Sequence, residues 1–214
     1  MKRLLFIFTL LLCWNAAYAL TNLTFVKQEL TNYYDSGAYF TEIENVVRPA
    51  KENLIEQAEH NLQHEKLAIV LDIDDTAISN YPNLKSVDFG GDHAMRIKIA
   101  LKGDAPAIPA VLALYNLALK ENVDVFFVTG RPNDLQEITE KMLKNDGYTK
   151  WTGIYFQTPE YKNIPISNFK TAMRKKITDM GCKIIENVGD QYSDLKGGYA
   201  LQQYKIPNPF YYIP

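Results

Sequence analysis

The stretch "KLAIVLDIDDTAISN", residues 66–80, decides the fold. In it an unbroken apolar run leads directly into three carboxylates, Asp72, Asp74 and Asp75. A short apolar run of this kind is typical of a strand that is buried on both faces of a parallel sheet. Burying a carboxylate is unfavourable unless a cation, a proton or hydrogen bonds compensate it. Acids at the end of such a strand therefore indicate a chemical site.

The rest of the chain repeats this pattern of apolar strands and intervening helices. Further apolar runs occupy 124–129, 153–158 and 183–189, and helical patterns occupy 108–122, 133–144 and 167–180. This alternation predicts an α/β fold, with a Rossmann-like parallel sheet flanked by helices. We expect residues 66–214 to form a single domain together with the segment that precedes them.

Residues 20–65 are predicted to form an N-terminal helical segment. Apolar side chains recur at spacings of three and four between Phe40 and Leu62, which marks one helix face. Pro49 is expected to divide this segment into two helices or to kink it. Residues 77–107 show no clear periodicity. Because a connection this long beside a site is usually functional, they are a candidate for a small lid.

Residues 1–19 have the pattern of a secretory signal peptide. Lys2 and Arg3 precede an apolar stretch, 4–14, that is too short to span a bilayer. Ala17, Tyr18 and Ala19 follow the small-x-small pattern of a cleavage site. We therefore expect an exported protein, periplasmic or secreted, without membrane association after cleavage.

The composition argues against two classes of partner. The 214 residues are 47% hydrophobic and 22% charged, with a formal net charge of −2. These values are those of an ordinary globular domain. Because there is no basic excess, we expect no binding to nucleic acid or to an anionic membrane surface.

Polar residues follow three of the predicted strands. They are Asp72 and Asp74, then Thr129, Gly130 and Arg131, then Asp190 and Asp194. Ligands of parallel α/β sheets bind at the carboxyl ends of the strands, so these side chains are expected to converge on one crevice. Acids without His or Cys among them make an oxygen-rich site, which fits Mg²⁺ better than zinc.

Such a site suits phosphoryl transfer. Mg²⁺ would offset the repulsion between the acids and keep Asp72 ionised, hence nucleophilic toward phosphorus. Asp74 would act as general acid toward the leaving group and later as base toward water. Thr129, with Gly130, would bind phosphate oxygens. Lys170, predicted in the first turn of a helix, would neutralise the phosphoryl group.

Simpler interpretations stay open for single motifs. Residues 72–76 alone could be a strand-end turn with solvated acids, and Lys170 alone could be a solvated helix lysine. Arg131 could reach the substrate or pair with an acid. An EF-hand loop is excluded, because Ala77 stands where that loop requires glycine and a strand precedes the motif in place of a helix.

Four motifs in order resemble the haloacid dehalogenase superfamily of phosphatases. They are "DIDDT" (72–76), "FVTGR" (127–131), Lys170 and "GDQYSD" (189–194). Longer stretches are similar to the class B-type acid phosphatase branch, which includes plant vegetative storage proteins and bacterial secreted acid phosphatases. These stretches are "APAIPAVLALYNLA" (105–118), "ENVGDQYSDLKGG" (186–198) and "YKIPNPFYYIP" (204–214).

The resemblance implies a haloacid dehalogenase-type fold and a Mg²⁺-dependent acid phosphatase that hydrolyses phosphate monoesters through a phospho-aspartate. It implies Asp72 as nucleophile and Asp74 as acid/base. The metal would be held by Asp72, the backbone carbonyl of Asp74 and Asp190, with Asp194 in support. Asp75 stands where such proteins often have Glu, and we expect no catalytic role for it. The alternatives are a catalytically weak storage or binding protein, and a phosphotransferase that passes the phosphoryl group to an alcohol.

The sequence leaves the ester open. Tyr81, Phe89 and Tyr192 could stack on a nucleobase or a phenyl ring, and core packing is an equal alternative for each. A nucleotide is therefore one candidate among small phosphate monoesters. The stretch "NPFYYIP" (208–214) is expected to be a strand or an extended tail whose aromatic side chains pack against the body of the protein.

Overall fold

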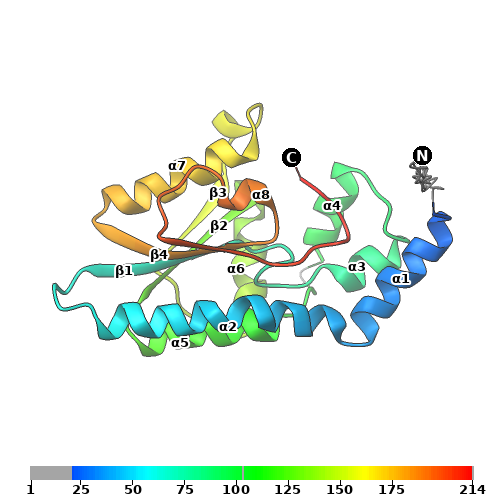
Figure 1. Ribbon diagram of the computed structural model, residues 1–214. Helices are drawn as coiled ribbons and strands as arrows, with labels where there is room; N and C mark the ends of the chain where they lie inside the picture. Colours follow the sequence, from blue (N-terminus) through cyan, green and yellow to red (C-terminus); the bar gives the residue numbers. More distant parts are fainter. Residues whose placement is uncertain (1–20, 103, 214) are drawn as a thin grey trace, which may run out of the picture.

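The computed structural model describes residues 21–102 and 104–213, and within them one parallel sheet organises the chain (Figure 1). Its five strands lie in the order β3-β2-β1-β4-β5. They are β1 (Lys66–Leu71), β2 (Asp124–Pro132), β3 (Gly153–Gln157), β4 (Cys182–Gly189) and β5 (Gln202–Lys205). The predicted α/β fold with a parallel sheet is confirmed. The predicted signal peptide lies outside the described residues.

Helices cover both faces of the sheet. They are α1 (Leu23–Asp35), α2 (Ala38–Glu59), α3 (Tyr81–Ser86), α4 (His93–Ala100), α5 (Pro109–Lys120), α6 (Gln136–Asn145), α7 (Ile166–Asp179) and α8 (Tyr192–Leu195), with short 3₁₀ turns at Asn133–Leu135 and Pro159–Tyr161. Figure 1 shows α2 and α5 below the sheet and α7 above it. No helix within the described ranges is both long and apolar enough to cross a membrane.

The central strand β1 explains the unbroken apolar run. Ile69 and Leu71 belong to the core on the α2 and α5 side, whereas Ala68 and Val70 belong to the core beneath α7. Successive side chains of a strand point to opposite faces, so a strand covered on both sides has no polar face to show. The sequence pattern of 67–71 follows from this position.

The register of the sheet aligns the strand ends. Leu71 pairs with Phe127 of β2 on one side and with Val188 of β4 on the other. The residues that follow these three positions therefore lie at one edge of the sheet. This is the edge where the sequence predicted a site.

The expected division of the helical segment at Pro49 is wrong, because α2 continues through that residue. Proline removes one backbone donor from a helix, but α2 packs a buried stripe against the body of the protein, including Val47, Ala50 and Leu54, and this packing offsets the loss. The break lies instead at Gly37, which separates α1 from α2 with a φ of +84°. Glycine adopts this left-handed conformation without strain.

Three further segments have a structure that the sequence pattern left open or did not predict. Residues 77–107 contain α3 and α4, each started by a local signal: a proline in the first turn of α3, and Asp92, whose side chain accepts a hydrogen bond from the Met95 N–H. Strand β5 was not predicted, because its residues are polar and lie at the sheet edge. Residues 206–213 form no strand; they run as an extended segment that buries Phe210.

Candidate active site

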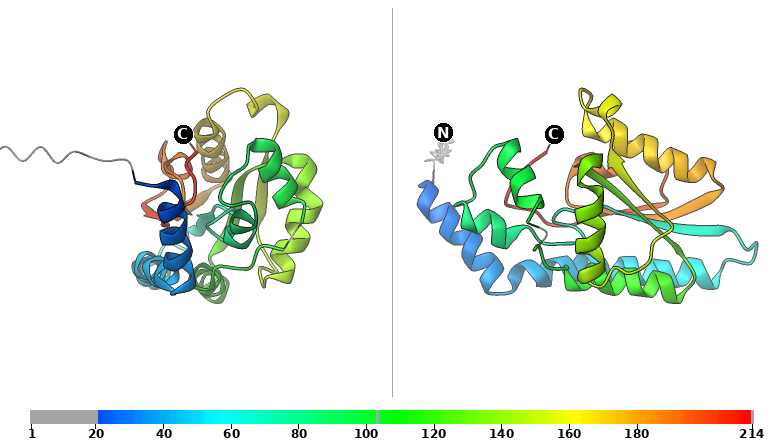
Figure 2. Two further views of the ribbon diagram at one scale, coloured as in Figure 1. Left: turned by 90° about the vertical axis from the view of Figure 1, so that its right-hand side faces the viewer. Right: turned by 180° about the vertical axis from the view of Figure 1, so that it is seen from behind.

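The carboxyl ends of the strands open into a cavity of about 310 Å³. Asp72, Asp74, Asp190 and Asp194 line one side of it together with Lys170. Leu84 of α3 and Ile97 and Ile99 of α4 line another side. Figures 1 and 2 show α4 and the C-terminal segment at the same end of the sheet. The cavity is thus charged at its floor and apolar on the side of the candidate lid.

Three buried carboxylates meet at the floor. Asp72 follows β1, Asp190 follows β4 and Asp194 lies in α8. One oxygen of each lies within 4.8 Å of an oxygen of the others. The Asp72 N–H donates to the carbonyl of Val188 (3.0 Å), which joins the first two strand ends. The sequence prediction that these acids converge is therefore supported by their geometry.

Gly189 allows Asp194 to come this close. A Cβ at residue 189 would stand 2.4 Å from the Asp194 Cβ, closer than two carbon atoms can approach. Asp194 is also held from the other side, because Arg174 of α7 donates to its backbone carbonyl (2.5 Å) and to that of Gly198 (2.9 Å). The short turn of α8 is thus fixed between β4 and α7.

Lys170 is the cation of the cluster. Its Nζ donates to Asp72 Oδ1 (2.6 Å) and to Asp194 Oδ1. Burial would lower the pKa of Lys170, but the Asp194 and Asp72 carboxylates outweigh it and hold that pKa above its usual value. Helix α7 begins at Ile166, one residue before the predicted start, so Lys170 lies at the beginning of the second turn instead of in the first.

The cluster carries more negative than positive charge. Three carboxylates and one ammonium sum to −3 + 1 = −2 when ionised. Burial raises the pKa of Asp72 well above its usual value, and Lys170 offsets this only in part, because the other acids raise it further. Burial and the neighbouring Asp194 likewise raise the pKa of Asp190 to about 7. An oxygen-rich group of this charge matches a divalent cation such as Mg²⁺.

Asp74 is paired with Arg131. The guanidinium donates to Asp74 through Nε (2.9 Å) and Nη2 (2.7 Å), and through Nη1 to Thr139 (3.1 Å). Burial would raise the pKa of Asp74, but the Arg131 charge and hydrogen bonds from Arg131 and Asn80 bring it below its usual value. Arg131 thus pairs with an acid, one of the two roles left open for it, and it also lines the cavity.

Asp75 lies behind the cavity floor and is fully buried. Its backbone is left-handed, with φ of +54°, a conformation that Asp tolerates better than most residues. Its carboxylate accepts hydrogen bonds from the Asn80 N–H (2.9 Å) and from the Tyr211 hydroxyl (2.8 Å). Burial raises its pKa to about 6. Asp75 does not line the cavity, which agrees with the expectation that it does not touch the substrate.

Thr129 and Gly130, which are predicted to bind phosphate together with Lys170, differ in their access to the cavity. Gly130 lines the cavity. Thr129 is fully buried beside it, and its Oγ1 accepts a hydrogen bond from the Arg131 N–H (3.0 Å). The Thr129 hydroxyl hydrogen has no protein acceptor among the hydrogen bonds of the described residues.

The aromatic residues singled out by the sequence lie away from the cavity. Tyr81 stacks on Tyr34 at 3.6 Å between ring centroids, and Phe89 packs beside Phe210 at 6.2 Å. Tyr192 is 61% exposed. The aromatic residues that line the cavity are instead Tyr211 and Tyr212 of the C-terminal segment.

Sequence reasoning also missed polar residues that contact the acids. Asn80, Gln191, Asn208 and Tyr211 each donate a hydrogen bond to one of them. Asn80 and Gln191 lie within a few residues of the motifs, and this proximity was the available signal. Asn208 and Tyr211 gave no such signal, because they approach the acids only through the tertiary fold.

Comparison with known proteins gives a family. A family model described as "HAD superfamily, subfamily IIIB (Acid phosphatase)" matches residues 13–214. A stem 28 kDa glycoprotein of Glycine max is 36% identical over 156 residues, which are 70% of this chain and 61% of that protein. Acid phosphatase 1 of Solanum lycopersicum is 32% identical over 148 residues, 67% of this chain and 58% of its own. The chain thus spans less than two thirds of the length of either relative.

A solved structure shares the fold. The class C acid phosphatase from Bacillus anthracis superposes with a TM-score of 0.74, covering 89% of this chain and 86% of that one at 19% sequence identity. The sheet and its flanking helices therefore have the architecture of a haloacid dehalogenase-type acid phosphatase.

Proposed function

Because the chain belongs to subfamily IIIB of the HAD superfamily, the acid phosphatases, we propose that it hydrolyses phosphate monoesters with Mg²⁺ through a phospho-aspartate on Asp72. The observation that carries this proposal is the buried cluster of Asp72, Asp190 and Asp194 with Lys170, at the strand ends and open to a cavity. The substrate class is a small phosphate monoester, and a nucleotide is one candidate.

The donor set fits the proposed metal. Asp72, Asp190 and the backbone carbonyl of Asp74 would hold Mg²⁺, and Asp194, which accepts hydrogen bonds from Lys170 and from the Gln191 N–H, would support them. Bound there, the cation would neutralise carboxylate and phosphoryl charge and so keep Asp72 ionised despite its burial. The charge of −2 supports a divalent ion over a monovalent one.

In the first step an oxygen of Asp72 attacks phosphorus and the ester P–O bond breaks, while Asp74, protonated for this step, gives its proton to the leaving oxygen. Lys170 holds Asp72 by a hydrogen bond of 2.6 Å and places its positive charge where the phosphoryl group is transferred. Gly130 lines the cavity beside this position and leaves room for the phosphate oxygens.

In the second step water attacks phosphorus, the bond to Asp72 breaks, and phosphate leaves. Asp74 accepts the proton of the attacking water. The pairing with Arg131 supports this half of its role, because it favours the ionised carboxylate. The same pairing works against proton donation in the first step. We therefore expect esters with acidic leaving groups, such as aryl phosphates, to react fastest.

The apolar side of the cavity would receive the leaving group. Leu84, Ile97 and Ile99, from the candidate lid, form this side. They offer van der Waals contact and no charge, which suits an aromatic or aliphatic group better than a second phosphate.

The test is turnover of a chromogenic phosphomonoester by the purified protein, with Mg²⁺ or with EDTA, for the unchanged chain and for Asp72→Asn. We expect EDTA to stop turnover and Asp72→Asn to lower kcat by at least about a thousandfold, since nucleophile loss removes the covalent path. Turnover that survives both changes would contradict the proposal. Turnover near the uncatalysed rate in the unchanged chain would favour the storage or binding alternative.

Two points remain predictions from the sequence. Product analysis with an added alcohol separates hydrolysis from phosphotransfer, because only a transferase forms the new ester. Export by residues 1–19 is tested by the N-terminal sequence of protein recovered outside the producing cell, which should begin after Ala19.

A further inference from the structure

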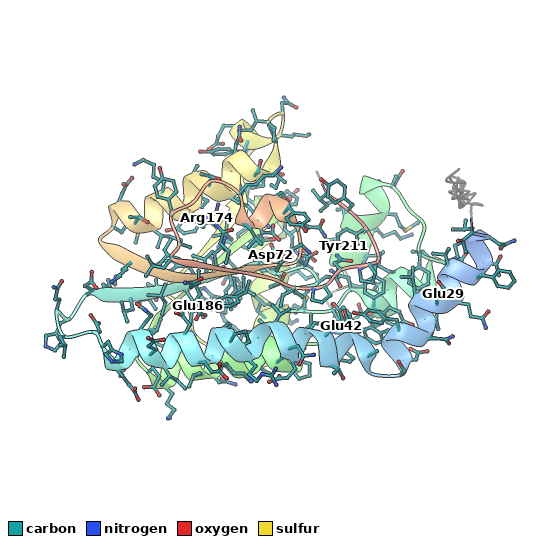
Figure 3. The ribbon with its side chains drawn as sticks, viewed as in Figure 1. Glu29, Glu42, Asp72, Arg174, Glu186 and Tyr211 are labelled. Carbon is teal, nitrogen blue, oxygen red and sulfur yellow. The ribbon has the colours of Figure 1, made fainter. Side chains whose placement is uncertain are left out.

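We propose that residues 206–213, the C-terminal segment, are part of the active site, and that Asn208 and Tyr211 are positioning residues for Asp190 and Asp74. This inference rests on the function proposed above. The segment lines the cavity with Tyr211, Tyr212 and Ile213, so it also forms one wall of the site. Figure 3 shows Tyr211 near Asp72, although 139 positions separate the two residues in the sequence (211 − 72).

The first contact reaches a proposed metal ligand. Asn208 Nδ2 donates to Asp190 Oδ2 (2.7 Å), and Gln191 Nε2 donates to the same oxygen (2.5 Å). The Ile213 N–H in turn donates to Gln191 Oε1 (2.9 Å). The segment therefore holds Asp190 directly through Asn208 and indirectly through Gln191.

The second contact reaches the proposed acid/base. The Tyr211 hydroxyl donates to Asp75 Oδ2 (2.8 Å). The Asn80 side-chain amide donates both to Asp75 Oδ2 (3.2 Å) and to Asp74 Oδ1 (2.8 Å). A chain of hydrogen bonds thus runs from Tyr211 through Asp75 and Asn80 to Asp74. In this arrangement Asp75, which does not touch the substrate, links the segment to a residue that does.

The segment is anchored on both sides of these contacts. The Ile206 N–H donates to the carbonyl of Gly189 (2.9 Å), at the end of β4. Phe210 is buried between Tyr39 and Tyr81, at ring-centroid distances of 5.5 and 5.4 Å. Asn208 Oδ1 accepts from the Phe210 N–H (2.9 Å) and shapes the turn between the two anchors. The contacts to Asp190 and Asp75 are therefore made by a segment with a defined position.

Hydrogen bonds of this kind orient a carboxylate without touching the ligand. Groups that orient a metal ligand typically change metal affinity by about 10–100-fold when they are removed. Groups that orient an acid/base change kcat, because they act on the proton transfer and not on substrate binding. The two positions therefore have different expected signatures.

The experiment compares Asn208→Ser and Tyr211→Phe with the unchanged protein. Serine keeps an oxygen that can accept the Phe210 N–H but is too short to donate to Asp190, and phenylalanine removes only the hydroxyl. Gln203→Ala is the matched control, since Gln203 is an exposed residue of β5. Mg²⁺ affinity is measured by calorimetry without substrate, and kcat and KM are measured with a chromogenic phosphomonoester.

We expect Asn208→Ser to raise the Kd for Mg²⁺ by about 10–100-fold. We expect Tyr211→Phe to lower kcat by about tenfold, with KM and the Mg²⁺ Kd within about threefold of the unchanged protein. Gln203→Ala should change neither quantity. Circular dichroism of each variant checks that the fold is kept, and the isosteric Tyr211→Phe keeps the test decisive if Asn208→Ser fails to fold.

The two proposals fail in different ways. If the unchanged protein binds Mg²⁺ and turns over substrate while both variants match it, the role of the C-terminal segment is wrong and the proposed function stands. If the unchanged protein neither binds Mg²⁺ nor hydrolyses the ester, the proposed function is wrong and this inference falls with it.

Discussion

Glu186 and Asp190 are two buried carboxyl groups only four residues apart in the sequence, and they have different surroundings. Glu186 lies within β4 and faces α2 (Figure 3), whereas Asp190 follows the last residue of β4. Burial raises the pKa of both, to about 8 for Glu186 and to about 7 for Asp190. A raised pKa therefore does not by itself mark an active site.

Their hydrogen bonds separate them. Glu186 accepts one bond, from Asn53 of α2 (2.9 Å), and its second oxygen has no partner among the described residues. Asp190 accepts bonds on both oxygens and lies beside two other acids at the cavity. Glu186 is thus an acid whose burial favours the protonated form, whereas Asp190 is an acid that hydrogen bonds orient at the cavity, where we propose that it binds the metal. The predictions below test this difference.

Among the changes that test this difference, the largest effect is expected at Asp190. Asp190→Asn removes a proposed ligand of the metal and leaves the amide donors of Gln191 and Asn208 in place. We expect kcat/KM to fall by about 100-fold or more and Mg²⁺ binding to weaken, because a neutral amide is a poorer ligand for Mg²⁺ than a carboxylate. Steady-state kinetics at several Mg²⁺ concentrations measure both. Activity that saturates at the usual Mg²⁺ concentration would remove Asp190 from the ligand set.

A smaller loss is expected at Gly189, the last residue of β4. Gly189→Ala places a methyl group 2.4 Å from the Asp194 Cβ, so Asp194 has to move away from Lys170 and Asp72. We expect kcat to fall by about 10–100-fold, because a displacement of this size disturbs catalytic geometry, together with a lower Tm. Kinetics and thermal unfolding measure the two effects. Gly198→Ala serves for comparison as a case of backbone strain without crowding, since nothing lies within 4 Å of its Cβ position but its φ is +75°.

At Glu186 the expected effect is on stability alone. In the folded protein its pKa is raised to about 8, so from roughly pH 5 to 8 the folded state keeps a proton that the unfolded chain has released. The free energy of unfolding should therefore fall as the pH rises through this range and level off above it. Asn53 on α2 and Tyr204 on β5 are the neighbouring polar groups, and burial also raises the pKa of Tyr204 to about 12.

Glu186→Gln should remove this dependence. We expect the free energy of unfolding of this variant to depend less on pH between pH 5 and 8. Its slope should be smaller than that of the unchanged protein by about 1 kcal/mol per pH unit, and kcat should be unaltered. Denaturant unfolding at pH 5 and pH 8 gives the comparison. The matched control is Glu56→Gln, because Glu56 is an exposed glutamate of α2, the helix that packs near Glu186. A pH dependence that persists in Glu186→Gln would show that another group causes it.

The smallest effect is expected at Tyr192, two residues beyond Asp190. Tyr192 is 61% exposed, and Lys205 Nζ lies 5.4 Å from the centroid of its ring. We expect Tyr192→Ala to leave KM within about twofold, whereas Tyr212→Ala, at the cavity wall, should raise KM for aryl esters several-fold. An equal rise in KM for both substitutions would mean that the leaving group extends beyond the cavity.

Most of the fold could be predicted because its signals are local. The apolar runs gave β1, β2, β3 and β4 to within a few residues at each end. The parallel topology followed from the alternation of strands and helices, and it placed Asp72, Gly130 and Asp190 at one edge. Strand β5 was missed because an edge strand of four partly exposed residues needs no apolar run. The division at Pro49 was wrong because packing of α2 outweighs local propensity.

What the sequence determined by itself is the central sheet and the set of acids at its edge, because burial on both faces requires apolar strands and leaves the strand ends as the place for charge. What only the tertiary structure decided is which side chains form hydrogen bonds or ion pairs with each acid. Arg131 pairs with Asp74, and Tyr211 and Asn208 reach Asp75 and Asp190 from a distant segment. Such contacts join side chains that are far apart in the sequence. Hydrophobic periodicity is a local signal and cannot predict them, because they depend on how the packed core positions distant segments.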